Sequence, residues 1–165
     1  MEINVVNGVG EGQTELSAFD AALKDSGVYN YNIMYLSSVI PAGAVVKEKG
    51  RLYDMPGKVG DRLYLVMAQE RSSIVAESVG AGIGWYHFGV EGGVFVEHET
   101  KGNSPVEVRE KLNYLIEYSL RDLCAFRNVE FDKSKLHTNL SITTVKNKPA
   151  CAMVLAVFEH AHWNS

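Results

Sequence analysis

The chain has 165 residues, of which 46% are hydrophobic and 22% charged, and its formal net charge at pH 7 is −4. This length and apolar content suffice for a sizeable core, so we expect a single domain over residues 1–165. The acidic balance disfavours a nucleic-acid partner, and no segment approaches the ~18 apolar residues of a membrane span. Because the N-terminus also lacks the pattern of a secretion signal, the sequence predicts a cytoplasmic protein with no membrane contact.

The N-terminal part of the chain predicts a strand, a turn and a helix. Ile3 to Val6 is a short apolar strand, and the glycines within residues 8–12 predict a flexible turn that tolerates positive φ. A helix should follow, with Thr14 as its N-cap and Gly27 just past its end. The apolar residues that recur at helical spacing in it are Leu16, Phe19 and Leu23.

Two further strands are predicted before residue 70. Residues 31–40 predict one continuous strand that Pro41 stops. A loop of mixed polarity, rich in glycine and proline, then runs to about Asp61. Arg62 to Gln69 predicts the next strand.

The middle of the chain contains one ambiguous segment and one clear strand. Residues 73–83 alternate as a strand does, whereas two valines four residues apart also fit a helix, and we favour the strand. Gly89 to Glu99 predicts a strand more clearly. Its alternation puts Glu97 on the same side as Phe95, so the two side chains should be buried or exposed together.

The clearest helix runs from Pro105 to about Phe126. Ser104 is its predicted cap, Pro105 suits the first helical position, and Glu107 completes the pattern of a capping box. The residues that we expect on its core face include Leu112, Leu115, Ile116 and Leu123.

Two final strands, over residues 140–146 and 151–159, flank Asn147-Lys148-Pro149, which predicts a hairpin turn. Strands therefore outnumber two helices placed at separate points in the order. This predicts an α+β fold in which helices lie outside packed antiparallel or mixed sheets. Cys124 and Cys151 have apolar neighbours and no metal-type spacing, so they are interpreted as buried thiols of a reducing compartment, with a disulfide left open.

Three other patterns suggest ligands but have simpler explanations. The glycines of residues 8–12 resemble a phosphate-binding loop, yet the Gly-Lys-Ser/Thr ending and the full dinucleotide spacing are missing. His160 and His162 could hold a metal, but no acid or Cys cluster accompanies them in the sequence, which favours a surface pair and no metal. The aromatic run over residues 85–87 could stack on a flat ligand, although such runs are more often core or interface.

The pair Ser37-Ser38, inside an apolar extended segment, carries a specific chemical possibility. If the Ser38 hydroxyl attacks the Ser37 carbonyl, an ester replaces the amide, and β-elimination followed by hydrolysis leaves a pyruvoyl group at residue 38 and releases ammonia. Such a reaction needs a strained peptide and a donor to the oxyanion, for which Asn32 is a candidate. Most Ser-Ser pairs are merely turn or strand-edge residues, so the pair alone does not establish cleavage.

The chain resembles the pyruvoyl-dependent arginine decarboxylase family in the order and spacing of several motifs. Over about the first 41 residues these are Gly10-Glu11-Gly12-x-Thr14-x-Leu16-x-Ala18-Phe19-Asp20, then Gly27, Asn30 and Asn32, then Leu36-Ser37-Ser38-Val39-Ile40-Pro41. A weaker resemblance resumes at Val94-Phe95-Val96-Glu97-His98-Glu99-Thr100-Lys101-Gly102. Residues 42–89 depart from the family pattern, which makes the substrate less secure than the type of reaction.

The resemblance implies roles for five residues. Ser37 and Ser38 match the self-cleavage pair, and Ser38 is the implied precursor of the covalent pyruvoyl cofactor, giving chains 1–37 and 38–165. Asn32 matches the residue that assists cleavage, Asp20 the acid that binds substrate, and Glu97 the proton-donating glutamate. The family's assembly is a homotrimer of αββα sandwiches with active sites at subunit interfaces.

The implied reaction is the decarboxylation of arginine to agmatine and carbon dioxide. The resemblance leaves open whether agmatine feeds polyamine synthesis or the reaction consumes protons during acid stress. A pyruvoyl ketone can form a Schiff base with the substrate amine and accept electrons, so neither pyridoxal phosphate nor a metal is expected. An ionised Asp20 would suit the planar guanidinium group of arginine. Two alternatives remain open, namely an uncleaved structural or regulatory homologue and a decarboxylase of another amino acid.

Overall fold

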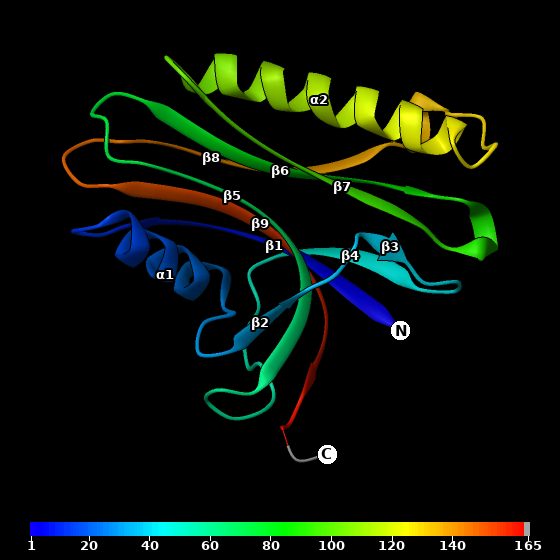
Figure 1. Cartoon of the computed structure of the whole chain (residues 1–165), viewed down its shortest axis with the longest axis horizontal. Helices are drawn as coiled ribbons and strands as arrows, with labels where there is room; N and C mark the ends of the chain where they lie inside the picture. The colour runs from blue at the N-terminus through cyan, green and yellow to red at the C-terminus, as the bar shows by residue number, and fades with distance from the viewer. Residues whose placement is uncertain (164–165) are drawn as a thin grey trace.

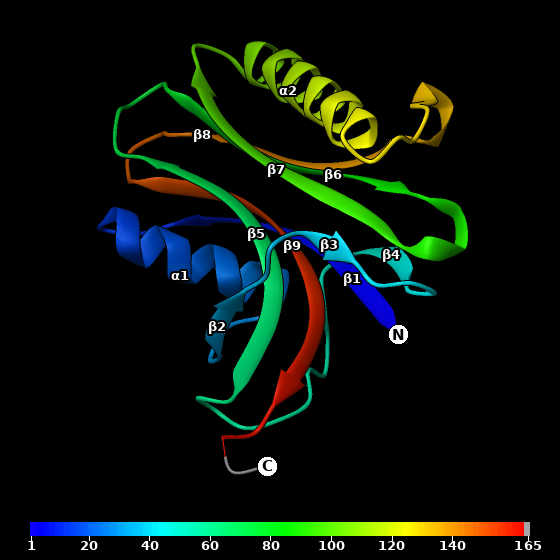
Figure 2. The same cartoon turned by 45° about the vertical axis from the view of Figure 1, so that its right-hand side comes forward.

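The computed structural model describes residues 1–163 as two stacked sheets between two helices (Figures 1 and 2). The first sheet has the strand order β2 (Asn32–Tyr35), β5 (Arg62–Ser72), β9 (Ala150–Ala161), β1 (Glu2–Glu11) and β4 (Val45–Gly50). The second has the order β3 (Val39–Ile40), β7 (Gly93–Gly102), β6 (Ser78–His87) and β8 (His137–Thr144). Short 3₁₀ turns lie at Gly89–Glu91 and Lys133–Lys135.

Helix α1 (Glu15–Ser26) packs against the first sheet, and α2 (Pro105–Ala125) against the second, each on the outer face (Figure 2). The second sheet is antiparallel throughout, whereas the first contains two parallel pairs, β1 with β4 and β2 with β5. Three apolar clusters fill the spaces between these four layers. The predicted α+β sandwich with external helices is confirmed.

The α1 prediction is confirmed at both caps, because the Thr14 side chain accepts a hydrogen bond from the backbone of Ser17 and Gly27 has φ +86°. The preceding glycines were interpreted wrongly, since Gly8 and Gly10 lie inside β1. A Cβ at Gly10 would lie 2.3 Å from the backbone nitrogen of Ala22, so these glycines let the helix approach the strand closely. Three small residues, Ala18, Ala22 and Ser26, accordingly share the buried face of α1 with Leu23. Of the apolar residues predicted for this face, Leu23 is buried, Phe19 is partly buried and Leu16 is 69% exposed.

Helix α2 packs on β6 in the same way, through glycines that alternate along the strand. A Cβ at Gly80 would lie 2.3 Å from a Val108 methyl, and one at Gly84 would lie 2.2 Å from an Ile116 methyl. The helix and its Ser104 cap are confirmed, but the capping box is incomplete, because the Glu107 carboxylate accepts from the N–H before the cap, at 2.8 Å. The fully buried residues of the helix are Val108, Leu112, Ile116, Leu120 and Cys124, whereas Leu115 and Leu123 are only partly buried.

The prediction of one strand over residues 31–40 is wrong in an informative way. The chain runs in the first sheet as β2, crosses over residues 36–38, and enters the second sheet as β3. The alternation of apolar and polar residues indicates extended backbone but not the sheet to which a strand belongs. The crossing between the sheets could therefore not be predicted from the sequence. The predicted loop after Pro41 also contains β4, an edge strand whose mainly exposed, charged residues hide its pairing with β1.

The remaining strands follow the predicted order with shifted ends. Residues 73–77 form a turn in which Ala76 has φ +70°, and the strand favoured for residues 73–83 begins only at Ser78. The hairpin predicted at residues 147–149 is wrong, because β8 pairs with β6 whereas β9 pairs with β1 and β5. Trp85 and Tyr86 are 3% and 2% exposed, which favours core packing over ligand stacking.

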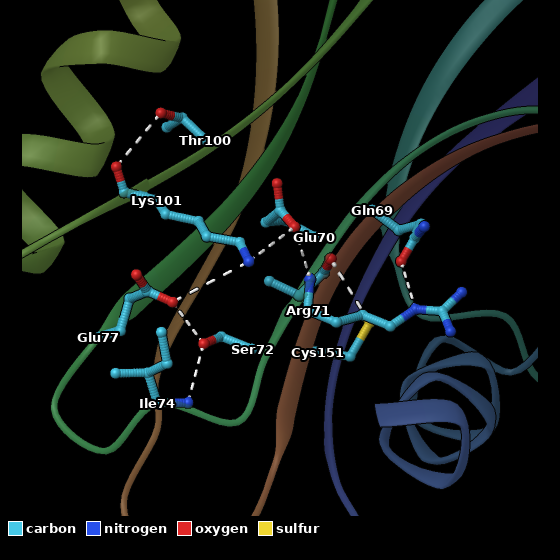
Figure 3. A network of polar contacts seen from close by, with 10 residues as sticks. Gln69, Glu70, Arg71, Ser72, Ile74, Glu77, Thr100, Lys101 and Cys151 are labelled. Atoms are coloured by element: carbon cyan, nitrogen blue, oxygen red, sulfur yellow. Dashed lines mark hydrogen bonds and ion pairs between the residues drawn. The ribbon is translucent and has the colours of Figure 1, made fainter. Parts of the chain in front are cut away.

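A polar network joins the two sheets at the turn between β5 and β6 (Figure 3). The Lys101 ammonium of β7 lies 3.6 Å from the Glu70 carboxylate of β5 and 4.0 Å from that of Glu77. Ser72 donates to Glu77 and accepts from the backbone N–H of Ile74 at 3.0 Å. The network therefore fixes the end of β7 that lies beyond Glu97.

Both cysteines are free and buried, as expected. Cys124 lies on the buried face of α2, and Cys151 lies on β9 under α1, so opposite layers of the molecule separate the two thiols. Burial raises the pKa of Cys151 to about 12. Over residues 1–163, neither helix combines the length and apolar character needed to cross a bilayer.

Candidate functional site

The Ser37-Ser38 junction lies where the chain passes from one sheet to the other, and backbone hydrogen bonds hold it on both sides. The N–H of Leu36 donates to the Leu65 carbonyl of β5 at 3.0 Å. The N–H of Phe95 on β7 donates to the Ser38 carbonyl at 2.8 Å. Only the short stretch between these bonds lacks sheet pairing, so the junction is anchored to two rigid sheets.

Ser38 has φ +65°, in the left-handed region that non-glycine residues rarely occupy. A residue held in this conformation costs on the order of 1–3 kcal/mol and persists only where the surroundings impose it. Here the two anchoring bonds and the pairing of Val39 with Val94 impose it. The backbone strain that the cleavage reaction requires is therefore found at Ser38 itself.

The Ser38 hydroxyl donates a hydrogen bond to Oε1 of Glu97. Glu97 lies on β7 two residues after Phe95, which is buried between the sheets, so the predicted shared face brings the carboxyl group to the serine. Burial raises the pKa of Glu97, and the Ser38 hydrogen bond lowers it by less. Two groups 59 residues apart in the sequence are therefore in direct contact.

A cavity of about 240 Å³ adjoins the exposed side chain of Ser37. Its walls are largely apolar and include Leu36, Pro41 and Phe158. Tyr64 and Glu159 add a ring and a carboxylate from β5 and β9. Sequence reasoning did not identify Glu159, because nothing in its strand distinguishes it from a solvated residue at a strand end.

The structure does not bring Asn32 or Asp20 to this junction within one chain. Asn32 starts β2, and its side-chain amide donates to the Gly60 carbonyl at 2.6 Å. Because an extended chain rises about 3.3 Å per residue, the five residue steps from Asn32 to Ser37 span roughly 16 Å. Asp20 is exposed on α1, on the outer side of the first sheet. The roles assigned to both residues remain predictions.

His160 and His162 have an acidic neighbour that the sequence did not reveal. Oδ2 of Asp61 lies 2.8 Å from Nδ1 of His162, although the two residues are far apart in the chain. The backbone N–H of Asn32 donates to the Asp61 carbonyl at 2.8 Å, so this cluster borders the start of β2. Only the pairing of β5 with β9 could have indicated it.

Comparison with known proteins identifies relatives along most of the chain. The family model described as "Pyruvoyl-dependent arginine decarboxylase (PvlArgDC)" matches residues 2–162. A protein of Thermococcus kodakarensis named "Pyruvoyl-dependent arginine decarboxylase" is 32% identical over 149 residues, which cover 89% of this chain and 87% of the relative.

Two further relatives with that name align over about half of their length. The Thermoplasma volcanium protein is 37% identical over 86 residues, or 51% of this chain and 46% of the relative. The Halobacterium salinarum protein is 39% identical over 83 residues, or 50% of this chain and 51% of the relative. Because the family match extends over nearly the whole sequence, including both Ser38 and Glu97, the chain belongs to the pyruvoyl-dependent arginine decarboxylase family.

Proposed function

We propose that this protein cleaves its own backbone between Ser37 and Ser38 and then decarboxylates L-arginine to agmatine. The observation that carries the proposal is the strained Ser38, whose hydroxyl contacts the one carboxyl group assigned to proton transfer. Family membership supports the reaction type, and the names of the relatives support arginine as substrate. Neither a metal nor pyridoxal phosphate is part of the proposed reaction.

In the proposed cleavage, Oγ of Ser38 attacks the carbonyl carbon of Ser37, and the C–N bond breaks to give an ester and a free amino group. Loss of the Ser38 α-proton then expels the Ser37 carboxylate and leaves dehydroalanine. Tautomerisation and addition of water release ammonia and leave the ketone at residue 38. The left-handed backbone of Ser38 favours the first step, because breaking the amide releases the strain.

The residues around Ser38 suit a pyruvoyl group formed there. Such a group supplies an electron sink for the α-carbon of an amino-acid substrate as carbon dioxide leaves. Glu97 is then positioned to hold a proton next to that carbon, and burial, which raises its pKa, favours the protonated form more than in an ordinary glutamate. The cavity beside Ser37 supplies apolar walls that exclude water from one side.

Asp20 and Asn32 can take part only if a second protomer supplies them. Within one chain Asp20 lies on the outer helix, and the Asn32 amide is bonded to Gly60. With the homotrimer that the family resemblance implies, we infer that each active site combines Ser38 and Glu97 of one protomer with Asp20 of a neighbour. Asn32 would reach the oxyanion across the same interface.

Denaturing mass spectrometry of active protein tests the cleavage. We expect fragments covering residues 1–37 and 38–165. The larger fragment should begin at its N-terminus with a ketone group that borohydride reduces. A Ser38→Ala variant should remain at the intact 18.2 kDa and release no carbon dioxide from arginine. An active preparation that contains only the intact chain would refute self-cleavage and favour an uncleaved homologue.

Carbon dioxide release from arginine, lysine, ornithine and histidine tests the substrate. Arginine should be preferred, and Asp20→Asn should raise its KM about tenfold or more while the chain still cleaves, since a charge-assisted bidentate contact is lost. Asp25→Asn, on the same helix, is the matched control, because its carboxylate caps the Val9 N–H at 2.9 Å and has no proposed substrate role. Equal KM values for Asp20→Asn and the unmodified protein would remove Asp20 from the site.

A further inference from the structure

Asp61, His160 and His162 form a compact cluster at one end of the first sheet, away from Ser38. Strands β5 and β9 are antiparallel, with Leu63 opposite His160 and Arg62 opposite Ala161. Extending this register by one residue puts Asp61 opposite His162. Because side chains alternate along a strand, all three side chains share one face. One ligand atom from each lies within 4.8 Å of the others.

The distances within the cluster suit a small cation. A tetrahedral ion with bonds of about 2.0–2.2 Å to nitrogen and oxygen separates its ligand atoms by roughly 3.3–3.6 Å. Asp61 Oδ2 and His162 Nδ1 are 2.8 Å apart, and the rings of His160 and His162 are perpendicular with centroids 5.4 Å apart. Small side-chain rotations would therefore place the three atoms around one ion.

The Asp61 carboxylate is held in place before any ion binds. Its side chain is only 8% exposed, and Oδ2 accepts the backbone N–H of Lys58 at 2.7 Å. This hydrogen bond, aided by the two histidines, lowers the pKa of Asp61, so the carboxylate is ionised at neutral pH. An ionised and oriented carboxylate is the form that binds metals.

The loop before Asp61 leaves room over the cluster because of a glycine. Gly57 has φ +98°, and a Cβ there would lie 2.7 Å from Asp61 Oδ2 and 2.8 Å from Cδ2 of His160. Any larger residue would therefore press on two of the three ligands. The nearby cation Arg62 donates a hydrogen bond to the backbone carbonyl of His162, and its guanidinium lies 5.1 Å from the ring centroid of Trp163.

We propose that Asp61, His160 and His162 bind a divalent transition-metal ion, with Zn²⁺ the best match, and that water completes the coordination. Two imidazoles and one carboxylate are a donor set typical of zinc, whereas Mg²⁺ and Ca²⁺ prefer oxygen ligands alone. The ion joins the end of β9 to the start of β5. The site lies beside Asn32 but includes no residue assigned to decarboxylation.

A simpler function for the cluster is an ion pair that fastens the end of β9 without a metal. The Asp61–His162 contact and the hydrogen bond from Trp163 to the Gly60 carbonyl, at 2.7 Å, would serve it. The two functions differ at His160, which a metal needs as a ligand and the ion pair does not. His160→Gln is therefore the decisive variant, because it leaves the Asp61–His162 contact in place.

The test is calorimetric titration of the full-length, EDTA-treated protein with Zn²⁺, with Co²⁺ as a spectroscopic probe. We expect one ion per chain, a visible Co²⁺ spectrum of low-symmetry coordination, and a Tm that rises with Zn²⁺. His160→Gln should weaken binding at least about tenfold, the usual minimum even for residues that only orient a ligand. His137→Gln, which removes an exposed histidine outside the cluster, should bind as the unmodified protein does.

Asp61→Asn provides an independent second variant, since the amide oxygen keeps the Lys58 hydrogen bond but loses the charge. It should also weaken Zn²⁺ binding at least about tenfold. Binding that is absent, or that His160→Gln and His137→Gln alter equally, would overturn the metal site and leave the ion pair as the explanation.

Discussion

A carboxyl group lies near each end of β2, and the surroundings shift the pKa values of the two groups in opposite directions. At the start of the strand, a backbone N–H and two histidines keep Asp61 ionised. Beyond its end, burial between the sheets raises the pKa of Glu97, and its hydrogen-bond partner is the neutral hydroxyl of Ser38. Residues with positive φ lie near both ends of the strand, Asn30 with φ +72° before it and Ser38 with φ +65° after it, but asparagine adopts this conformation more readily than serine.

This contrast shows how environment assigns chemistry to equivalent groups. A carboxylate fixed by hydrogen-bond donors can bind a cation but is a poor proton donor at neutral pH. A carboxyl group in an apolar setting can hold and release a proton in that range. This difference supports the chemistry proposed near Ser38 and the metal binding proposed near Asp61.

The largest effect should come from Glu97→Gln. The amide oxygen can still accept the Ser38 hydrogen bond, so the chain should cleave, but decarboxylation should fall about 10²- to 10⁴-fold because a proton donor is lost. Mass spectrometry and carbon dioxide release measure the two steps separately. Glu99→Gln, two residues along β7, is the matched control, and normal turnover by Glu97→Gln would exclude Glu97 from proton transfer.

The strain at Ser38 can be measured in chains that cannot cleave. Ser38→Gly should be more stable than Ser38→Ala by about 1 kcal/mol, because alanine pays about 1–2 kcal/mol in the left-handed region and glycine does not. Urea unfolding gives the difference. At Ser37, where φ is not positive, alanine should be at least as stable as glycine, and the same order at both positions would argue against strain at Ser38.

The smallest of the three predicted effects is on the pH dependence of the free energy of unfolding. Glu97 and Asp61 should change this free energy in opposite directions as pH rises. Because the folded pKa of Glu97 is raised, its contribution falls as pH rises above about 4.3, its ordinary value. The folded pKa of Asp61 is lowered, so its contribution is complete above about 3.9 and is lost as pH falls through the folded pKa.

Urea unfolding from about pH 3 to 7, in a Ser38→Ala background that stays intact, tests both signs. Relative to that background, Glu97→Gln should gain stability as pH rises, and the penalty of Asp61→Asn should shrink as pH falls. Parallel pH profiles for the two variants would show that the ends of β2 do not differ in this respect.

The fold was predictable where a local signal decides the structure. Ser104 and Pro105 define the start of α2, and Thr14 and Gly27 define both ends of α1. Local sequence signals do not predict the structure where packing between distant parts of the chain determines it. Gly8 and Gly10 are strand residues because α1 lies against them, and residues 36–38 change sheets because of partners elsewhere in the chain.

The candidate site was predictable to a similar extent. Alternation along β7 correctly placed Glu97 with Phe95, but the contact with Ser38 depends on β3 pairing with β7. Asp61 could not be linked to His160 and His162, because only the register of β5 against β9 brings them together. The contribution proposed for Asp20 depends on contacts with other protomers, which no sequence pattern within one chain defines.

The placement of β1 has a consequence for the proposed cut. Residues 1–37 include β1, which lies inside the first sheet between β9 and β4 and pairs with β9 from Asn4 to Glu11. After cleavage between Ser37 and Ser38, β1 of the short fragment would thus remain hydrogen-bonded on both sides to strands of the longer fragment. The two pieces should travel together through any native purification and come apart only when the sheet itself is unfolded.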